Sequence, residues 1–336
     1  MTTELEAWLA QTAEDPIDPE LPICDPHHHF WNSYWGAAGS YLVPDLLRDI
    51  GAGHRIARTV FLEVGAEYRT SGPVSMRPLG ETEWVRDIAV EAAGDVSKNT
   101  AVAAGIVGHV DLRLGASATE VLEAHVEAVG DRFKGIRHSA TWPPNPAAPP
   151  YRTWPQGLLK DSTFREGFAC LQGLGLSFDA WVFHYQLTEL VDLARAFPDT
   201  SIILDHTGGP LGTDPYAEER DQAVQDWRHG ISELATCPNV VVKLGGLGMH
   251  FGGFGWNERA TPPASAELAE AMSPYFLFCI EKFGVDRCMF ESNFPVDKVS
   301  YSYTVIWNAF KRICSGFSPT ERAALFHDTA SRVYRL

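Results

Sequence analysis

The chain has 336 residues, of which 45% are hydrophobic and 21% charged, and its 27 Lys and Arg against 43 Asp and Glu give a formal net charge of −16. This composition excludes a disordered chain, and the negative charge disfavours nucleic acid and anionic membrane surfaces as partners. The N-terminus lacks the pattern of a signal peptide and no run of about 18 apolar residues occurs, so the sequence predicts a cytoplasmic protein without a membrane span.

The six cysteines are scattered without a C-x-x-C pair, and several stand inside apolar runs. This pattern predicts reduced thiols in the core. None of them stands beside a recognisable base, which disfavours a nucleophilic cysteine.

Residues 1–21 form an acidic arm with a short helical stretch, and we expect it to pack on the outside of the protein. From residue 22 to 336, short runs rich in Val, Ile, Leu and Phe alternate with amphipathic stretches. The predicted strands lie near 22–25, 58–64, 101–108, 133–137, 176–183, 201–205, 240–244 and 287–291. The clearest predicted helices lie at 82–93, 117–129, 164–173, 187–197, 217–236, 265–283 and 318–327. Eight strands separated by helices predict a single α/β domain folded as a (β/α)₈ TIM barrel.

An open, doubly wound sheet would show the same alternation of strands and helices. The barrel is favoured because polar residues collect just past the ends of several different strands, where barrel enzymes place their catalytic groups.

Two segments interrupt the alternation and are interpreted as lid loops. Residues 141–151, after strand 4, are rich in proline and carry Trp142, which predicts a stiff loop with an aromatic tip. Residues 245–256, after strand 7, are rich in glycine but lack the G-K-[ST] ending of a phosphate loop, so an adaptable substrate cover is the better interpretation.

The strongest chemical signal is Asp25-Pro26-His27-His28-His29 at the end of strand 1. Residues two apart on a strand point to the same side, so His27 and His29 both point into the barrel while His28 faces away. Two imidazoles placed in this way can hold a divalent metal or orient a carbonyl group.

Two further histidines end predicted strands, His184 after strand 5 and His206 after strand 6. A single histidine is usually a satisfied core or surface residue. Because both fall at the same mouth of the barrel as His27 and His29, we expect the four imidazoles to converge there.

The strand 1 His-x-His, the segment Asp205-His206-Thr207-Gly208-Gly209-Pro210, the segment 243–247 and the segment 289–295 together resemble the amidohydrolase superfamily. The chain is most similar to the branch related to 2-pyrone-4,6-dicarboxylate lactonase, the sugar-acid lactonases and 4-sulfomuconolactone hydrolase. The resemblance covers residues 22–336.

This resemblance implies that His27, His29 and His184 bind one divalent metal, with zinc as the expected ion, and that His206 polarises the substrate or assists proton transfer. A zinc ion with an open coordination position lowers the pKa of bound water to about 7 and so supplies a nucleophile at neutral pH.

The sequence departs from the family at the end of strand 8, where Gly-Ser-Asp-Trp-Pro is usual and this chain has Glu291-Ser292-Asn293-Phe294-Pro295. The expected catalytic Asp is therefore Asn293, which cannot act as a general base and is a poorer zinc ligand. Our hypothesis is that Glu291 or Asp297 takes over proton transfer. The alternative is that Glu291 is a buried partner of an interior cation such as Lys243.

Several other side chains are candidates for binding substrate. Arg137, at the end of strand 4, offers a fork that suits a carboxylate, and its segment is similar to one that supplies an anion-binding arginine in related lactonases. Lys243 and Lys298 are further cationic candidates, and Glu63 and Tyr68 after strand 2 and Trp142 after strand 4 are expected to line the pocket.

The sequence thus predicts a hydrolase that opens a small lactone, or a related C–O or C–N bond, of a carboxylate-bearing or aromatic small molecule by attack of a water held by histidines or metal. A metal-free form of the same reaction stays open because Asn293 replaces the usual Asp. Two alternatives remain, a metal-dependent decarboxylase of an aromatic or unsaturated acid and a barrel that binds a ligand without turnover. The oligomeric state, a homo-oligomer included, is left open.

Overall fold

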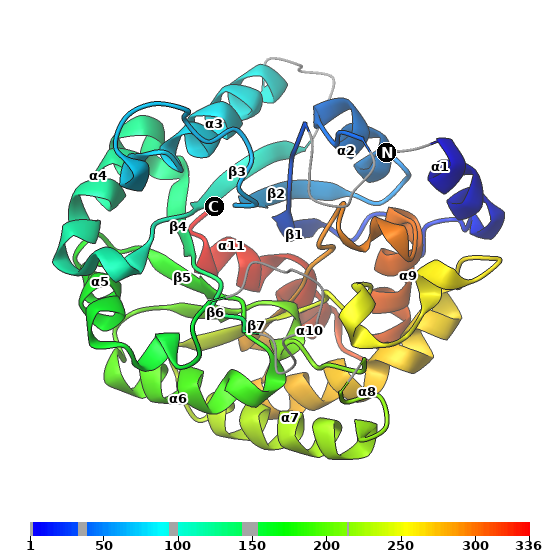
Figure 1. The fold of residues 1–336 in the computed structure, drawn as a ribbon. Helices are drawn as coiled ribbons and strands as arrows, with labels where there is room; N and C mark the ends of the chain where they lie inside the picture. Colours follow the sequence, from blue (N-terminus) through cyan, green and yellow to red (C-terminus); the bar gives the residue numbers. More distant parts are fainter. Residues whose placement is uncertain (1–2, 33–38, 94–99, 143–153, 214) are drawn as a thin grey trace.

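The protein is a closed ring of parallel strands surrounded by helices. The computed structural model describes residues 3–32, 39–93, 100–142, 154–213 and 215–336. All eight strands are parallel and hydrogen-bonded in chain order (Figure 1). They are β1 (Ile23–His28), β2 (Ile56–Leu62), β3 (Ala101–Gly108), β4 (Phe133–Arg137), β5 (Ser177–Ala180), β6 (Ile202–Leu204), β7 (Val240–Leu244) and β8 (Cys288–Phe290).

The ring closes between β1 and the segment after β8. Asn293 N donates to His27 O at 3.0 Å, and His29 N donates to Phe294 O at 2.8 Å. The predicted (β/α)₈ barrel is therefore confirmed, and these two closing hydrogen bonds fix the backbone of the strand 1 histidines against the strand 8 segment.

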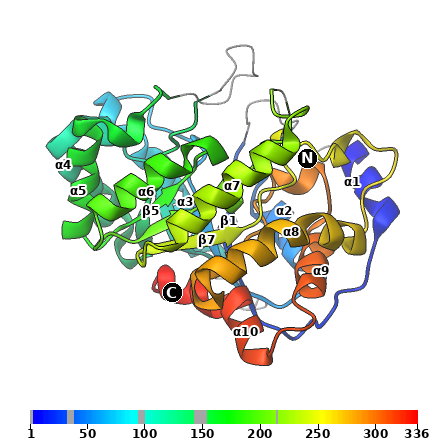
Figure 2. The ribbon, with the colours of Figure 1, turned by 90° about the horizontal axis from the view of Figure 1, so that it is seen from below.

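Helices form the outer layer of the barrel (Figures 1 and 2). Asp161 and Ser302 cap two of them by accepting hydrogen bonds from backbone N–H groups of the first turn. The predicted helix at 318–327 begins at a Ser318–Glu321 capping box but gives way to a π-helical turn over residues 324–328. The helices are α1 (Thr3–Leu9), α2 (Val43–Ile50), α3 (Leu79–Ala93), α4 (Ala118–Val129), α5 (Ser162–Gly173), α6 (Leu187–Ala196), α7 (Arg220–Ala235), α8 (Ser265–Phe283), α9 (Tyr303–Ile313), α10 (Pro319–Ala323) and α11 (Thr329–Val333).

One end of the barrel interior is filled by the C-terminal segment, which lies over the centre of the ring in Figure 1. Ala330, Val333 and Tyr334 pack in one buried cluster with strand residues Cys24, Val60, Leu62, Val107, Ile203, Val241 and Met289. This apolar plug leaves the opposite, C-terminal ends of the strands to form the mouth of the barrel.

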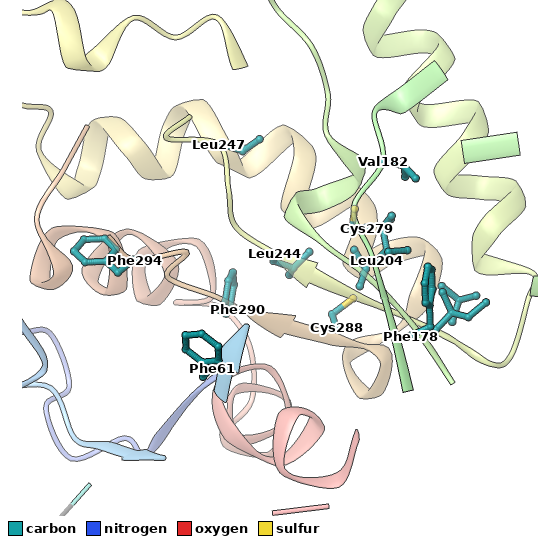
Figure 3. Close-up of a cluster of buried hydrophobic side chains, with 14 of the residues drawn as sticks. Phe61, Phe178, Val182, Leu204, Leu244, Leu247, Cys279, Cys288, Phe290 and Phe294 are labelled. Atoms are coloured by element: carbon teal, nitrogen blue, oxygen red, sulfur yellow. The ribbon is translucent and has the colours of Figure 1, made fainter. Parts of the chain in front are cut away.

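The main core lies between the strands and the helices. Figure 3 shows part of it, a buried cluster that contains Phe178, Leu204 and Phe290 of the strands and Cys279 of α8. All six cysteines are free, and burial raises the pKa of the Cys24 thiol to about 12. The predicted reduced thiols are thus found, five of them buried.

The acidic arm packs on the outer side of the barrel. Trp8 Nε1 donates to Arg259 O at 3.0 Å, Thr12 Oγ1 donates to Pro262 O at 2.9 Å, and Glu14 accepts a hydrogen bond from Ser265 N at 2.7 Å. These contacts join the arm to the segment that leads from β7 into α8.

The structure describes the second of the two predicted lid loops in full. Residues 143–151 of the first lie outside the described residues. The second, 245–256, is held in place: Gly248 N donates to Asp297 at 3.1 Å, and Ser300 Oγ donates to Gly248 O at 2.6 Å. Within the described ranges, no helix has the length and apolar character needed to cross a membrane.

Candidate active site

Strand β1 separates its histidines as the alternation of a strand requires. His28 points out of the barrel, where its ring centroid lies 4.8 Å from that of Phe30 and 6.1 Å from that of Phe61, and neither ring nitrogen has a hydrogen-bond partner among the residues that the structure describes. His27 points inward. Burial lowers the pKa of His28 to about 3 and that of His27 well below its ordinary value, so both are neutral at pH 7.

The imidazoles of His27 and His29 face each other through their Nε2 atoms, which lie 3.2 Å apart. His29 Nδ1 lies 2.8 Å from Leu62 O, and because a carbonyl oxygen only accepts, this nitrogen carries the proton. His27 Nδ1 lies 2.7 Å from the acceptor Glu291 Oε2 and 3.2 Å from the donor Lys243 Nζ, and the closer contact favours a proton on Nδ1. Each Nε2 therefore presents a lone pair towards the other ring.

Glu291, directly after β8, bridges His206 and His27. Its Oε1 accepts a hydrogen bond from His206 N at 3.0 Å and lies 2.8 Å from His206 Nδ1. His206 has a φ of 53°, in the left-handed region that residues with a Cβ rarely adopt, and this carboxylate helps to hold it there. Burial by itself raises the pKa of Glu291, but the pairing with His206 and His27 outweighs burial and brings the pKa well below its ordinary value. Glu291 is therefore an ionised partner of the two histidines.

Arg137, the last residue of β4, is held by groups of the site itself. Its Nε donates to Glu63 Oε1 at 3.0 Å, and a second nitrogen donates to Glu63 O. The remaining nitrogen lies 3.3 Å from His27 Nε2 and 3.7 Å from Asp205 Oδ2. The structure thus brings Arg137 and Glu63 to the histidines, as predicted, but pairs them with each other.

Lys243 of β7 forms the deepest part of the polar interior. Its Nζ lies 2.7 Å from Asp179 Oδ2, 3.0 Å from Asp205 Oδ1 and 3.2 Å from His27 Nδ1. Tyr334 Oη also donates to Asp179 Oδ2, at 2.5 Å. Fully buried, Lys243 is a structural cation rather than the expected ligand for a substrate carboxylate.

Sequence reasoning did not assign Asp179, Asp205 or Tyr334 to the site. The signal for the two aspartates was present, because an acidic residue in an otherwise apolar strand must find a cation inside the barrel. Nothing in the sequence pairs the C-terminal Tyr334 with β5. Lys298, another cationic candidate, lies at 2.7 Å from Asp49 and 2.9 Å from Glu6 instead.

Asn293 and Asp297 are coupled to each other. Asn293 Nδ2 donates to Asp297 Oδ1 at 2.8 Å, and Asp297 Oδ2 accepts from Tyr301 Oη at 2.6 Å and from Gly248 N. Burial raises the pKa of Asp297 to about 6. Because both carboxylate oxygens are used within the protein, this arrangement favours a positioning role for Asp297 over the expected proton transfer.

His184 is the predicted ligand that the structure does not bring to the group. Leu211 N donates to His184 Nδ1 at 3.3 Å, and the imidazole packs against the rings of Tyr185 and Tyr216 at centroid distances of 5.4 and 4.8 Å. In the described part of the chain, no hydrogen bond, ion pair or ring contact joins it to the other three imidazoles. The chain leaves β5 at Ala180, so the irregular segment that follows decides where His184 points.

Two aromatic candidates occupy separate places. The Trp142 ring lies 4.9 Å from that of Tyr185, and Tyr68 is half-buried after β2. A third aromatic residue, Trp181, was missed although its centroid lies 4.6 Å from that of His206. It stands two residues after the inward-pointing Asp179, and the alternation of the strand could have identified it.

The site contains a group that fits a divalent metal. His27, His206 and Glu291 present ligand atoms that all lie within 4.8 Å of one another, and the facing Nε2 of His29 adds a further nitrogen. Imidazole nitrogens and a carboxylate are ligands that zinc binds. Among the described residues, four buried carboxylates also face two cationic side chains here, a charge balance that favours a bound cation; they are Glu63, Asp179, Asp205 and Glu291 against Arg137 and Lys243.

Comparison with known proteins extends these observations. Residues 24–336 match the sequence model of a family described as Amidohydrolase. The uncharacterized protein y4mH of Sinorhizobium fredii (strain NBRC 101917 / NGR234) is 35% identical over an alignment of 336 positions, which covers 94% of this chain and 99% of that protein. An L-fucono-1,5-lactonase of Burkholderia multivorans (strain ATCC 17616 / 249) is 26% identical over 93% of this chain and 95% of its own. A solved amidohydrolase from Burkholderia multivorans with bound zinc has a TM-score of 0.69 at 25% identity, covering 94% of this chain and 99% of its own.

Proposed function

The chain belongs to the amidohydrolase family, and we propose that it is a hydrolase that opens a small lactone ring. The lactonase among its relatives supports this proposal. The observation that carries it is the buried Glu291 carboxylate, which holds His206 Nδ1 at 2.8 Å.

Pairing with Glu291 defines what His206 can do. A carboxylate that accepts from Nδ1–H fixes the tautomer in which Nε2 has a lone pair, and it stabilises the imidazolium that forms when Nε2 takes a proton. In the described part of the chain, His206 Nε2 makes no hydrogen bond. His206 is therefore proposed as the group that moves the proton, with Glu291 as its positioning residue.

The reaction balances with this single base. Nε2 of His206 takes a proton from water while the water oxygen bonds to the lactone carbonyl carbon. The ring C–O bond of the tetrahedral intermediate then breaks, and the same imidazolium returns its proton to the leaving alkoxide, so the products are a hydroxy group and a carboxylic acid, which releases its remaining proton to solvent and becomes a carboxylate. Because Glu291 keeps a low pKa, it stays ionised through the cycle and holds no proton itself.

Two further side chains are proposed to orient the reactants. Arg137 Nη1, the nitrogen that is not paired with Glu63, lies 3.3 Å from His27 Nε2, and it is suited to stabilise negative charge that develops on the carbonyl oxygen. Asn293 donates through Nδ2 to Asp297, which leaves its Oδ1 as the acceptor available to water or substrate.

We propose zinc as the divalent metal, held at the Nε2 atoms of His27 and His29, because His206 Nδ1 and the Glu291 carboxylate of the same group are engaged with each other. Their lone pairs face each other at 3.2 Å, and both Nδ1 atoms are held by acceptors, which is the outer support that metal-binding histidines usually have. When bound, zinc supplies a water of lowered pKa. Arg137, 3.3 Å from His27 Nε2, would compete with the ion.

The test is a lactone hydrolysis screen of the purified protein, followed by proton release, with metal content measured on the same sample. We expect hydrolysis of at least one lactone class, with loss of turnover in His206→Gln. Release of carbon dioxide from aromatic or unsaturated acids, or binding of ligands without any turnover, would replace the proposal with one of the two alternatives. A cytoplasmic location is part of the proposal and is supported by the six free cysteines.

A further inference from the structure

The rings that surround the mouth beside His206 form one continuous surface, which we term the aromatic wall. It consists of Trp181, Phe183, Tyr185, Leu211, Tyr216 and Phe251. Its members come from the segments after β5, β6 and β7, all at the C-terminal ends of strands.

The aromatic wall begins at the catalytic histidine. Trp181 stands edge-on to His206 at 4.6 Å and lies 5.4 Å from both Phe183 and Phe251. The Phe183 ring continues the surface to Tyr185 at 6.0 Å. A ligand whose carbonyl faces His206 therefore has an apolar surface directly beside it.

The aromatic wall combines side chains that are buried with side chains that are partly exposed, as a ligand-binding surface does. Phe183, Leu211 and Phe251 are 5 to 8% exposed and back the wall. Trp181, Tyr185 and Tyr216 are only half-buried, so part of each ring is open to a ligand. Aromatic rings placed in this way gain most from contact with another apolar or aromatic group.

Acidic side chains act on the tyrosines of the aromatic wall, and a cation lies at its Phe251 end. Burial and the neighbouring Tyr216 raise the pKa of Tyr185, and the charge of Glu189 adds to this effect; burial and the charges of Asp226 and Glu219 raise the pKa of Tyr216. Arg220 donates to Gly252 O, next to Phe251. Near its tyrosines the wall therefore disfavours an anionic ligand.

Arg137, the cation expected to bind a substrate carboxylate, is already paired with Glu63 inside the protein. Arg137 donates to Glu63 through two nitrogens and lies 3.3 Å from His27 with the third. Binding a substrate carboxylate there would require breaking this buried pair with Glu63.

We propose that the substrate is an uncharged lactone with an aryl or bulky alkyl substituent, which packs on the aromatic wall while the ring carbonyl faces His206. This inference rests on the proposed lactonase function. Of the two substrate types expected from the sequence, this inference keeps the aromatic substrate and drops the carboxylate-bearing one.

The experiment compares four lactones with the full-length protein: δ-phenyl-δ-valerolactone, δ-valerolactone, L-fucono-1,5-lactone and 2-pyrone-4,6-dicarboxylate. We expect kcat/KM for the phenyl lactone to exceed that for δ-valerolactone by roughly tenfold or more, since a buried phenyl face contributes that much. Trp181→Ala and, separately, the milder Phe251→Leu should remove most of this preference, measured as the ratio of the two kcat/KM values. Leu277→Ala, at a 39% exposed position on α8, is the matched control and should change neither rate.

The outcomes separate this inference from the proposed function. Preference for the dicarboxylate or the sugar-acid lactone, or a phenyl preference that survives both wall variants, overturns the aromatic-wall inference and leaves lactone hydrolysis intact. If no lactone is hydrolysed, calorimetric binding of the stable analogue 6-phenylpiperidin-2-one decides. Binding that Trp181→Ala weakens keeps the ligand class while the reaction is abandoned, and absence of binding ends both.

Discussion

Replacing Glu291 by Gln changes the site with almost no change in volume. The carboxylate lies 2.8 Å from His206 Nδ1 and 2.7 Å from His27 Nδ1 and is fully buried. The amide has one acceptor oxygen, so its NH₂ group must face one of the two protonated nitrogens and force that ring into the other tautomer. Losing the charged partner of a buried pair costs about 3–5 kcal/mol of stability.

The expected loss of activity is larger than the loss of stability. Without the carboxylate, the imidazolium of His206 is no longer stabilised and its tautomer is not fixed, so kcat for the best lactone should fall by about 10²- to 10⁴-fold. KM should change little, because Glu291 does not touch the substrate in this mechanism.

The assay is steady-state lactone hydrolysis alongside urea denaturation of the same preparation. Glu14→Gln is the matched control, because Glu14 also accepts hydrogen bonds from Ser265 N and Asn308 Nδ2 but lies in the N-terminal arm. It should lower stability modestly and leave kcat unchanged. A folded Glu291→Gln protein that keeps more than about a tenth of the wild-type kcat would show that the His206–Glu291 pair does not carry the reaction.

Three further results are expected. His28 has a pKa of about 3 in the folded protein against 6.5 when unfolded, so the unfolded chain binds more protons below pH 6.5 and the stability of the fold falls as the pH drops towards 3. His28→Phe should therefore recover roughly 2–3 kcal/mol of unfolding free energy at pH 4.5, measured by urea melts at several pH values. The same gain in His229→Gln, at an exposed position, would contradict this cause. Arg137→Met removes a cation 3.3 Å from His27 Nε2, so zinc affinity in equilibrium dialysis should rise by about tenfold or more, and unchanged affinity would argue against a metal at this position. Lys243→Met leaves the carboxylates of Asp179 and Asp205 without their cation and should lower the free energy of unfolding in urea by about 3–5 kcal/mol. Adding Asp179→Asn should restore part of this loss. No loss, or no restoration, would mean that Lys243 does not balance these charges.

The barrel could be predicted from the sequence because the patterns that indicate its strands and helices are local. Alternation of apolar runs with amphipathic stretches is set by the periods of strands and helices, and the helix predicted at 117–129 is found as α4. Helix α9 was not among the predicted helices, although Thr304, Asn308 and Lys311 recur at helical spacing in its sequence. Nine of its eleven residues are buried, so its polar side chains find partners inside the protein.

The convergence of His27, His29 and His206 was also determined by the sequence. All three stand at or just past the ends of strands β1 and β6, and in a parallel barrel those ends meet at one mouth. The inward direction of His27 and the outward direction of His28 followed from the two-residue period alone.

Only the tertiary structure decided what each polar group pairs with. His184 leaves the group because it stands four residues beyond β5, where loop conformation and not strand period sets its direction. Arg137 pairs with Glu63, and Glu291 with two histidines, since a buried charge must take its partner from whichever strand the closed ring brings beside it. Those partners are separated by tens to hundreds of positions along the chain, so no local pattern encodes them.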